Sequence, residues 1–378
     1  MMKRTPVYLD YNATAPIRPA VVKAMQAAMD RPMNPSSVHS FGRQAKRLVD
    51  EARAKITASV GAEGYHVIFT GSGTEANNLA LKGIKTGMVL ASAIEHSSVL
   101  QAVPDAVQIP VDANGVSDLK ALKKLLATKH KPLVTVMLAN NETGAIQPIA
   151  EIAQLVHAAG GIFHCDAVQG LGKMPLDISL LNVDVLTLSA HKIGGPQGVG
   201  ALLVKPGLVL ESQIVGGGQE LGFRAGTENV AGIVGFGVAV EAVAELQTKA
   251  RYLAIMRDRM ESEIRAIAPE SVVAAEGTER LPNTSCITMP GVKNETQLIH
   301  FDLQNIALSA GAACSSGKIG VSHVLLAMGW DKQEAESAVR ISLGAETLQG
   351  EVDRFVSAWK ELYLRVGVSE TQPLKEAI

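Results

Sequence analysis

Reactive polar side chains follow five apolar runs of the chain, at the point where each run ends. The runs have the composition of buried strands, and the polar groups after them occupy residues 70–75, 94–96, 140–144, 166–169 and 189–192. In an open α/β sheet, ligands bind beyond the carboxyl ends of the strands. Folding alone does not require five strands to deliver such side chains to one edge, so the pattern predicts a functional site there.

The turn 71–74 (Gly-Ser-Gly-Thr) stands after a predicted strand and before a predicted helix. Its backbone N–H groups and hydroxyls could hold a phosphate. Gly71, Gly73 and Ala76 also fit the dinucleotide fingerprint G-x-G-x-x-A, and Glu95, about 20 residues further on, would be the acid that binds the ribose. A plain tight turn is a comparable interpretation, so three interpretations of this turn stay open.

Lys192 and Asp166 suggest covalent cofactor chemistry. Lys192 ends the run 189–192 (Ser-Ala-His-Lys), and a desolvated lysine there could form a Schiff base with an aldehyde. Asp166 ends an apolar strand, where a carboxylate is unfavourable unless a cation such as a protonated pyridine nitrogen faces it. Taken singly, an ordinary loop lysine and a helix N-cap are the alternatives.

Histidines add less specific signals. His96 could stack on a flat ring or shuttle protons, although a hydrogen-bonded core histidine is the commoner use. His164 and Cys165 have no further ligands at metal-binding spacing and point to opposite faces of a strand, so no metal site is expected. A phosphate cradle, an aldehyde-capturing lysine, a carboxylate for a pyridinium and donors for a ring oxygen together describe a site for pyridoxal 5′-phosphate (PLP).

The elements that position these residues alternate between strands and helices. Continuous apolar strands separated by helices indicate an α/β fold with a mainly parallel sheet that is covered on both faces. From about 228 to 268 the chain is predicted to form one nearly unbroken helix, which leads to a smaller C-terminal part. Strands are predicted at 67–69, 88–91, 133–138, 161–165, 183–188, 200–204, 285–289 and 339–343, and helices at 41–56, from residue 74 and at the C-terminal end.

The ordered motifs make the chain resemble the cysteine desulfurases (NifS/IscS-like), within the class V aminotransferase group of fold-type I PLP-dependent enzymes. The resemblance runs from residues 8–14 to residues 340–344, nearly the whole chain. It implies a large PLP-binding domain over 12–250 and a smaller α+β domain, formed by 1–11 and 251–378, that carries a catalytic cysteine loop. The matching stretches in between are 34–39, 73–78, 95–96, 140–144, 166–169, 189–192, 216–220 and 224–229.

The resemblance also implies a role for each site residue. Lys192 would hold PLP as a Schiff base and move the Cα proton, and Asp166 would pair with the ring nitrogen. Gln169 would donate to the phenolate oxygen of the ring, and His96 would stack on the ring as a catalytic residue. Thr227 would reach the cofactor phosphate of a neighbouring subunit, which implies a homodimer with shared active sites. The remaining implied contacts are to the cofactor phosphate, from Gly73, Thr74, Ser189 and His191, and to the substrate carboxylate, from Asn141 and Arg340.

Cys314 lies in the run 309–317 (Ser-Ala-Gly-Ala-Ala-Cys-Ser-Ser-Gly), whose small residues predict a mobile loop. The resemblance makes its thiolate the nucleophile that takes the sulfur of L-cysteine as a persulfide and leaves L-alanine. The persulfide would pass to a sulfur-acceptor or Fe–S scaffold protein, for iron–sulfur cluster assembly or thio-modification. Cys286, in a predicted strand, is interpreted as an ordinary buried cysteine.

Three other functions stay open. The first is a selenocysteine lyase or another PLP-dependent β-elimination on the same fold. The second is an NAD-dependent oxidoreductase that uses the glycine fingerprint, which leaves Lys192, Asp166 and Gln169 without a use. The third is a non-catalytic scaffold that binds sulfur-acceptor partners.

Net charge, the length of apolar stretches and the cysteine count argue against several other classes of protein. The chain has 378 residues with 35 Lys plus Arg against 37 Asp plus Glu, and a net charge of −2 argues against nucleic-acid binding. No signal peptide is recognisable. The longest uncharged apolar stretch, 230–240, is expected to be too short for a bilayer, which needs about 20 residues. Three cysteines, an odd and sparse count, favour a reducing compartment, so a cytoplasmic protein with no membrane association is expected.

Overall fold

A seven-stranded sheet forms the centre of the larger part of the molecule in the computed structural model, which describes residues 5–128, 131–311 and 320–367. β8 runs antiparallel to both of its neighbours, and the other neighbouring strands are parallel. The predicted α/β fold with a mainly parallel sheet is confirmed, although the short edge strand β4 has no clear sequence signal. In spatial order the strands are β2 (His66–Thr70), β8 (Gly200–Val204), β7 (Val185–Ser189), β6 (Ile162–Asp166), β5 (Leu133–Thr135), β3 (Val89–Ser92) and β4 (Val107–Ile109).

Helices cover both faces of this sheet because its strands are apolar on both faces. On β8, Leu202 and Val204 belong to the hydrophobic cluster that includes α3 (Gly73–Gly83) and α4 (Ser97–Leu100). Ala201 and Leu203 alternate with them and belong to a different cluster. That second cluster includes α1 (Pro19–Met29), α2 (Ser40–Ser59), α5 (Leu119–Ala127), α6 (Ile149–Ala158), α7 (Ile178–Leu181) and α8 (Val230–Glu241).

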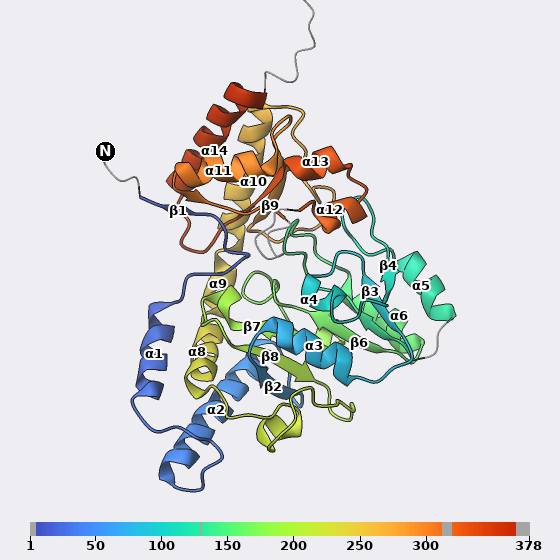
Figure 1. Cartoon of the computed structure of the whole chain (residues 1–378), viewed down its shortest axis with the longest axis vertical. Coiled ribbons are helices and arrows are strands. Elements are labelled where there is room, and N and C mark those ends of the chain that lie inside the picture. The colour runs from blue at the N-terminus through green and yellow to red at the C-terminus, as the bar shows by residue number, and fades with distance from the viewer. Residues whose placement is uncertain (1–4, 129–130, 312–319, 368–378) are drawn as a thin grey trace, which may run out of the picture.

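The smaller part of the molecule lies at one end of the long axis, above the sheet in Figure 1. Its strands β9 (Thr284–Thr288) and β11 (Ala338–Ser342) are antiparallel, and the amino-terminal strand β1 (Val7–Tyr8) pairs with β10 (Ile306–Ala307). The amino-terminal Leu9 shares a separate hydrophobic cluster with Phe301 and Trp359, while the exact domain limits stay a prediction. The helical elements here are α10 (Ala250–Ile267), α11 (Asn294–Leu303), α12 (His323–Ala327), α13 (Lys332–Ser337), α14 (Gln349–Leu362) and η3 (Tyr363–Gly367).

The long helical stretch after residue 228 is three helices rather than one. α8 is followed by α9 (Val243–Thr248) and then by α10, with breaks at Ala242 and Lys249. The predicted nearly unbroken helical stretch is thus confirmed over residues 230–267, and its two short breaks were not predicted. Neither break carries the proline or glycine that would mark it in the sequence.

α8 is a helix of the protein core. Its glycines allow close approach to neighbouring helices, since a Cβ on Gly237 would lie 2.9 Å from Cα of Ala52 in α2. α8 and α9 together form a stretch of 19 residues, 230–248, that is long and apolar enough to cross a membrane by length and composition alone. The predicted uncharged run 230–240 is shorter than this stretch, which reaches its length by including Glu241 and Glu245. Half of its most apolar window is buried inside the protein, as expected for a core helix.

Candidate active site

A cavity of about 460 Å³ is lined both by residues that follow the sheet strands and by residues of the smaller part of the molecule. The sheet contributes Asp166 at the end of β6 and Lys192 in the short helix η1 (Ala190–Ile193), directly after β7. The smaller part contributes Ser309 and, from β11, Arg340. Ten residues predicted for the site line this one cavity: Gly73, Thr74, His96, Asn141, Asp166, Gln169, Ser189, His191, Lys192 and Arg340.

The turn before α3 forms a cradle for an anion. Ser72 caps the helix by accepting a hydrogen bond from the Glu75 N–H at 3.1 Å, and Gly73, the first helical residue, lines the cavity. The amino end of this helix therefore offers free N–H groups and a partial positive charge. Gly200 in β8 packs directly against this turn, because a Cβ there would lie 2.5 Å from the Ser72 carbonyl carbon. The cradle thus depends on a glycine outside the turn itself.

His191, beside the cradle, is a neutral imidazole at neutral pH. Burial, followed by the nearby charge of Lys192, lowers the pKa of His191 to about 4. Its Nδ1 pairs with the Thr14 hydroxyl at 3.1 Å. A neutral imidazole held in this way keeps one N–H that can be donated to a phosphate oxygen.

Asp166 is a carboxylate whose two oxygens are both held from the protein side. Its side chain is buried, with 6% exposure, and Oδ2 accepts from the Asn77 amide at 2.7 Å while Oδ1 accepts from the Val168 N–H at 3.0 Å. The bond to Val168 is the local backbone contact expected of the N-cap alternative. The same side chain nevertheless lines the cavity, so it can also face a cationic ring nitrogen. Sequence reasoning gave Asn77 no role, although it lies four residues after Gly73 in a matching motif.

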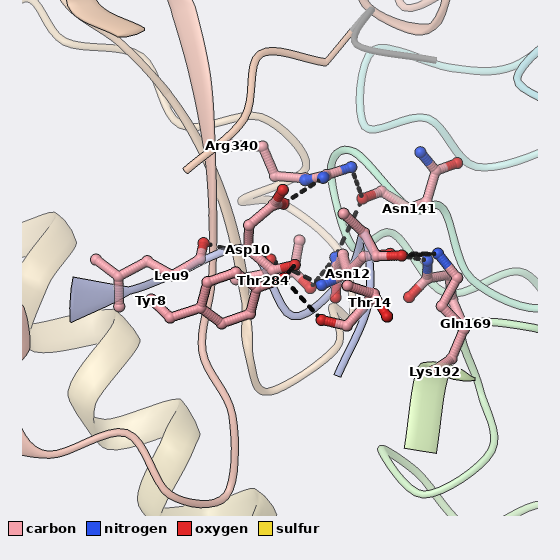
Figure 2. Close-up of polar contacts among 12 residues, drawn as sticks. Tyr8, Leu9, Asp10, Asn12, Thr14, Asn141, Gln169, Lys192, Thr284 and Arg340 are labelled. Carbon is pink, nitrogen blue, oxygen red and sulfur yellow. Dashed lines mark hydrogen bonds and ion pairs between the residues drawn. The ribbon is translucent and has the colours of Figure 1, made fainter. Parts of the chain in front are cut away.

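Lys192 is held at the wall of the cavity by the amino-terminal segment. Its Nζ donates to the backbone carbonyl oxygens of Asn12, at 2.6 Å, and Ala13, at 2.8 Å. Figure 2 shows this amine directed at Asn12, with the Gln169 side chain beside it. The amine is therefore placed at the cavity, as a lysine that captures an aldehyde requires, whereas an ordinary loop lysine would be expected to extend into solvent.

His96 and Gln169 have the positions expected for contacts to a flat ring. His96 caps α4 through Nδ1, and burial, with the charges of Lys192 and His323 opposing that of Asp166, lowers its pKa. The lowered pKa disfavours the protonated ring. Gln169 donates from Nε2 to the Asn12 carbonyl at 3.0 Å, the same oxygen that holds Lys192. A cofactor oxygen placed near this carbonyl would find the Gln169 donor within reach.

Arg340 presents a guanidinium that is already engaged by a carboxylate of the chain. Its Nη2 donates to Asp10 Oδ1 at 2.6 Å and its Nη1 to the Asn141 carbonyl at 3.2 Å, whereas its Nε is buried without a partner in the described part of the chain. Figure 2 shows the fork between these two residues. Sequence reasoning missed Asp10, because the only signal was an acid in the matching stretch 8–14. Asp10 occupies part of the surface that a substrate carboxylate would use.

Glu95 is a core residue and cannot serve as the acid of a ribose site. It has 0% exposure, and its Oε1 accepts from the Met137 N–H at 2.6 Å. Burial, followed by the charge of Asp166, raises the pKa of Glu95 well above its ordinary value. The dinucleotide alternative therefore loses its acid and is wrong for this fold.

The cysteines divide into two buried residues and one outside the described range. Burial raises the pKa of Cys286 to about 12 and that of Cys165 well above its ordinary value, so neither forms a thiolate readily. The interpretation of Cys286 as an ordinary buried cysteine is confirmed. Cys314 lies outside the described residues, and it is the third of three cysteines in the chain. Its predicted role as nucleophile stays a prediction.

Two further expectations concern Thr227 and metal binding. Thr227 is exposed in the loop before α8 and does not line the cavity, so its predicted contact across a dimer stays a prediction. His164 bonds to the hydroxyls of Thr135, at 2.8 Å, and Thr187, at 3.0 Å, which makes it a satisfied core histidine. In residues 5–128, 131–311 and 320–367, no three His, Cys, Asp or Glu side chains gather as metal ligands would.

The donor set of this cavity fits PLP. The glycine-dependent cradle suits a phosphate, the buried carboxylate of Asp166 suits a protonated ring nitrogen, and Lys192 provides the amine. Among the described residues, Asn77 and Arg340 both line the cavity and each keeps one buried side-chain atom without a partner, Oδ1 of Asn77 and Nε of Arg340. Fold and site together define an α/β enzyme that uses PLP.

The chain belongs to the aminotransferase class-V family, whose model matches residues 7–355. Among curated relatives, the cysteine desulfurase IscS of Dictyoglomus turgidum is 39% identical over 367 residues, which cover 93% of each chain. The cysteine desulfurase of Trichormus azollae is 38% identical and covers 95% of this chain and 93% of its own. The predicted resemblance to cysteine desulfurases is thus confirmed, and with it the dependence on PLP.

Solved structures agree with the sequence relatives. The NifS-like protein from Rickettsia africae has a TM-score of 0.89 at 38% identity and covers 95% of this chain and 99% of its own. A structure described as SspA in complex with cysteine has a TM-score of 0.75 at 31% identity and covers 91% of this chain and 100% of its own. The fold is therefore that of the NifS-like enzymes.

Proposed function

We propose that this chain is a PLP-dependent cysteine desulfurase, which converts L-cysteine to L-alanine and takes the sulfur onto Cys314 as a persulfide. The observation that carries the proposal is the meeting of Lys192, Asp166 and Arg340 at one cavity. These residues come from two strand ends of the large sheet and from the smaller part of the molecule. The names of the curated relatives, and the neighbour described as a complex with cysteine, support L-cysteine as the substrate.

Each wall of the cavity has a task in this reaction. When bound, PLP supplies an aldehyde that captures the substrate amine and a ring that accepts electrons. The cradle at Gly73, with Thr74 and Ser189, binds the phosphate, and Asp166 holds a proton on the ring nitrogen. His96, which lines the cavity, would stack on the ring of the cofactor and exclude water from that side. These contacts fix the cofactor relative to Lys192.

The substrate is oriented by its carboxylate and activated at its Cα. Arg340, with Asn141, binds the carboxylate through the planar guanidinium fork. Lys192, whose amine reaches the same cavity, would take the proton from Cα. Fixing the carboxylate and moving this proton are the steps that the chain's own residues perform at the carbon skeleton.

Sulfur transfer needs a thiolate, and Cys314 is the remaining candidate because the other two cysteines are buried. Its thiolate attacks the substrate sulfur, so that an S–S bond forms while the Cβ–S bond of the substrate breaks. The electron pair from that bond stays with the carbon skeleton, which takes up protons to become L-alanine. No external oxidant or reductant is required, and the persulfide then passes to an acceptor.

The proposal extends to partners and compartment. A homodimer would bring Thr227, exposed in this chain, to the cofactor phosphate of the other subunit. A sulfur-acceptor or Fe–S scaffold protein would receive the persulfide for cluster assembly or thio-modification. The cytoplasm is the proposed compartment, since the sparse cysteines suit reducing conditions.

The test is an absorbance spectrum of the purified, PLP-loaded protein before and after addition of L-cysteine, with alanine assayed. We expect a yellow protein that bleaches with borohydride, and alanine release that is absent in Lys192→Ala. Loss of alanine release in Cys314→Ser supports the desulfurase, whereas retained turnover in that variant would establish a selenocysteine lyase or other β-eliminating enzyme. A yellow protein that releases no alanine would support the scaffold alternative.

A further inference from the structure

Lys173 is a half-buried lysine beside the active-site cavity for which the proposed reaction has no use. It lies at the end of the turn that follows β6, four residues after Gln169, and its Nζ donates to the Asn12 side-chain oxygen at 2.7 Å and to Gln169 Oε1. It lines an adjoining, largely apolar cavity of about 480 Å³, whereas Lys192 lines both cavities. Lys173 therefore lines the adjoining cavity and contacts two residues of the active-site cavity, Asn12 and Gln169.

The contact with Gln169 decides which end of that amide faces the active site. An ammonium can only donate, so it fixes the amide oxygen on its own side. The Nε2 end is then left to face the Asn12 carbonyl and the active-site cavity. Without Lys173, only the hydrogen bond to the Asn12 carbonyl would hold the amide. A half-turn of the amide, which presents an acceptor to the cofactor where a ring oxygen needs a donor, would then be less strongly opposed.

Asn12 is held by the same ammonium. Its Oδ1 accepts from Lys173 and from Asn283 at 3.2 Å, and its Nδ2 donates to Thr284 at 2.9 Å and to the Asn141 carbonyl at 3.1 Å. Its backbone oxygen in turn accepts from Lys192 and Gln169 (Figure 2). Asn12 itself has 1% exposure, so the centre of this network is buried. The orientation of Gln169 is thus fixed from both of its ends.

The position is unfavourable for a cation, which argues against a purely incidental contact. Burial, followed by the charges of Lys192 and Arg340, lowers the pKa of Lys173 well below its ordinary value. A methionine would fill the same volume without that penalty. The two hydrogen bonds are what the amine contributes at this site.

We propose that Lys173 is a positioning residue for the cofactor: it orients the Gln169 amide so that its Nε2–H group donates a hydrogen bond to the ring oxygen of PLP. The inference rests on the proposed function only in so far as that function requires PLP. A donor to the ring oxygen stabilises the unprotonated form of the lysine–cofactor linkage more than the protonated form, in which the linkage itself donates to that oxygen. Gln169, correctly oriented, therefore lowers the pH at which the visible cofactor band titrates.

The experiment follows that band against pH in the PLP-loaded protein without substrate. Lys173→Met is expected to raise the midpoint by about one pH unit, which is a tenfold change in the proton equilibrium. Lys173→Arg, which keeps the donors, is expected to restore most of the parent value. Lys205→Met is the matched control, because Lys205 pairs with Asp184 outside the cavity, and its midpoint stays at the parent value.

A double variant separates orientation from charge. In a Gln169→Ala background, Lys173→Met is expected to leave the midpoint unchanged, since there is no amide left to orient. The proposal is overturned if the midpoint of Lys173→Met equals that of the parent, or if its full shift persists when Gln169 is absent, which would make Lys173 a simple charge. Lys173→Leu, which also lacks a donor, replaces the methionine variant if thermal unfolding shows that the latter does not fold. This titration is done without the substrate L-cysteine. A protein that binds PLP but releases no alanine would therefore refute the desulfurase assignment and leave this test valid.

Discussion

Asp10 holds the guanidinium of Arg340, which is proposed to bind the substrate carboxylate, and replacing Asp10 by asparagine tests this competition. In the parent protein, Asp10 Oδ1 accepts from Arg340 Nη2 at 2.6 Å. In Asp10→Asn, the side-chain oxygen can still accept this hydrogen bond, while the negative charge is removed. A substrate carboxylate on the other side of the fork would stand about 7 Å from Asp10, where two like charges repel by roughly 2 kcal/mol at an effective dielectric of about 20. Asp10 is 19% exposed and Arg340 4%, so solvent screens only part of this repulsion.

We therefore expect the KM for L-cysteine to fall about tenfold in Asp10→Asn, equivalent to ~1.4 kcal/mol, with little change in kcat. The inhibition constant of L-alanine, which carries the same carboxylate, is expected to fall by the same factor. Without a carboxylate ligand, the variant is expected to unfold more easily by about 1–3 kcal/mol, because the buried guanidinium loses its counter-charge.

The assay is initial-rate alanine formation over a range of L-cysteine concentrations, with thermal unfolding measured in parallel. Asp258→Asn is the matched control, since Asp258 also contacts a buried arginine, Arg257, at 2.6 Å but does not line the active-site cavity. Its KM is expected to equal that of the parent. An unchanged or higher KM in Asp10→Asn would refute the reasoning, because the substrate carboxylate would then not share Arg340 with Asp10.

Two further predictions concern the phosphate cradle and the buried Glu95. Gly200→Ala is expected to displace Ser72, weaken PLP binding at least about tenfold and cost ~1–3 kcal/mol of stability through overpacking. Gly87→Ala, where a Cβ meets nothing within 4 Å, is the control in a fluorescence titration with PLP, and equal affinity of both variants would contradict the cradle. Glu95 has a raised pKa in the folded protein, so its contribution to stability is fully present in acid and is lost as pH rises from about 4.5 through that raised pKa. Glu95→Gln and the parent are thus expected to have similar stability in acid, with the variant unfolding at a progressively higher temperature than the parent as pH rises, and a pH-independent difference would show that Glu95 is not buried as described.

The predicted strands and their polar ends could be read from the sequence because both are local properties. An apolar run such as 183–188 followed by polar residues encodes a buried strand that ends at the ligand edge, and the structure places Lys192 there. The same local logic failed for Glu95, whose spacing from the glycine turn suits a ribose acid. The direction of its side chain is set by the segment just after β5, where Met137 offers a buried N–H, and no local pattern records that.

The residues that sequence reasoning missed act over long separations. Asp10 and Arg340 lie 330 positions apart, and Lys173 contacts Asn12 across 161 positions. Such pairs depend on how the amino-terminal segment crosses from the smaller part of the molecule to the sheet. The sequence shows that a residue carries a carboxylate or an amine. The partner of that group, and therefore its role, is decided by the tertiary fold. The breaks between α8, α9 and α10 were hidden for another reason, since ordinary helix-forming residues occupy them.

The central claim is that Lys192, and no other lysine, binds the cofactor aldehyde. Borohydride reduction of the PLP-loaded protein, followed by proteolysis and fragment mass spectrometry, locates the linked lysine directly. The account predicts a pyridoxyl group on Lys192 alone, including in the Lys173→Met variant. A pyridoxyl group on Lys173 or on a surface lysine, or protein that remains unlabelled after loading, would contradict it.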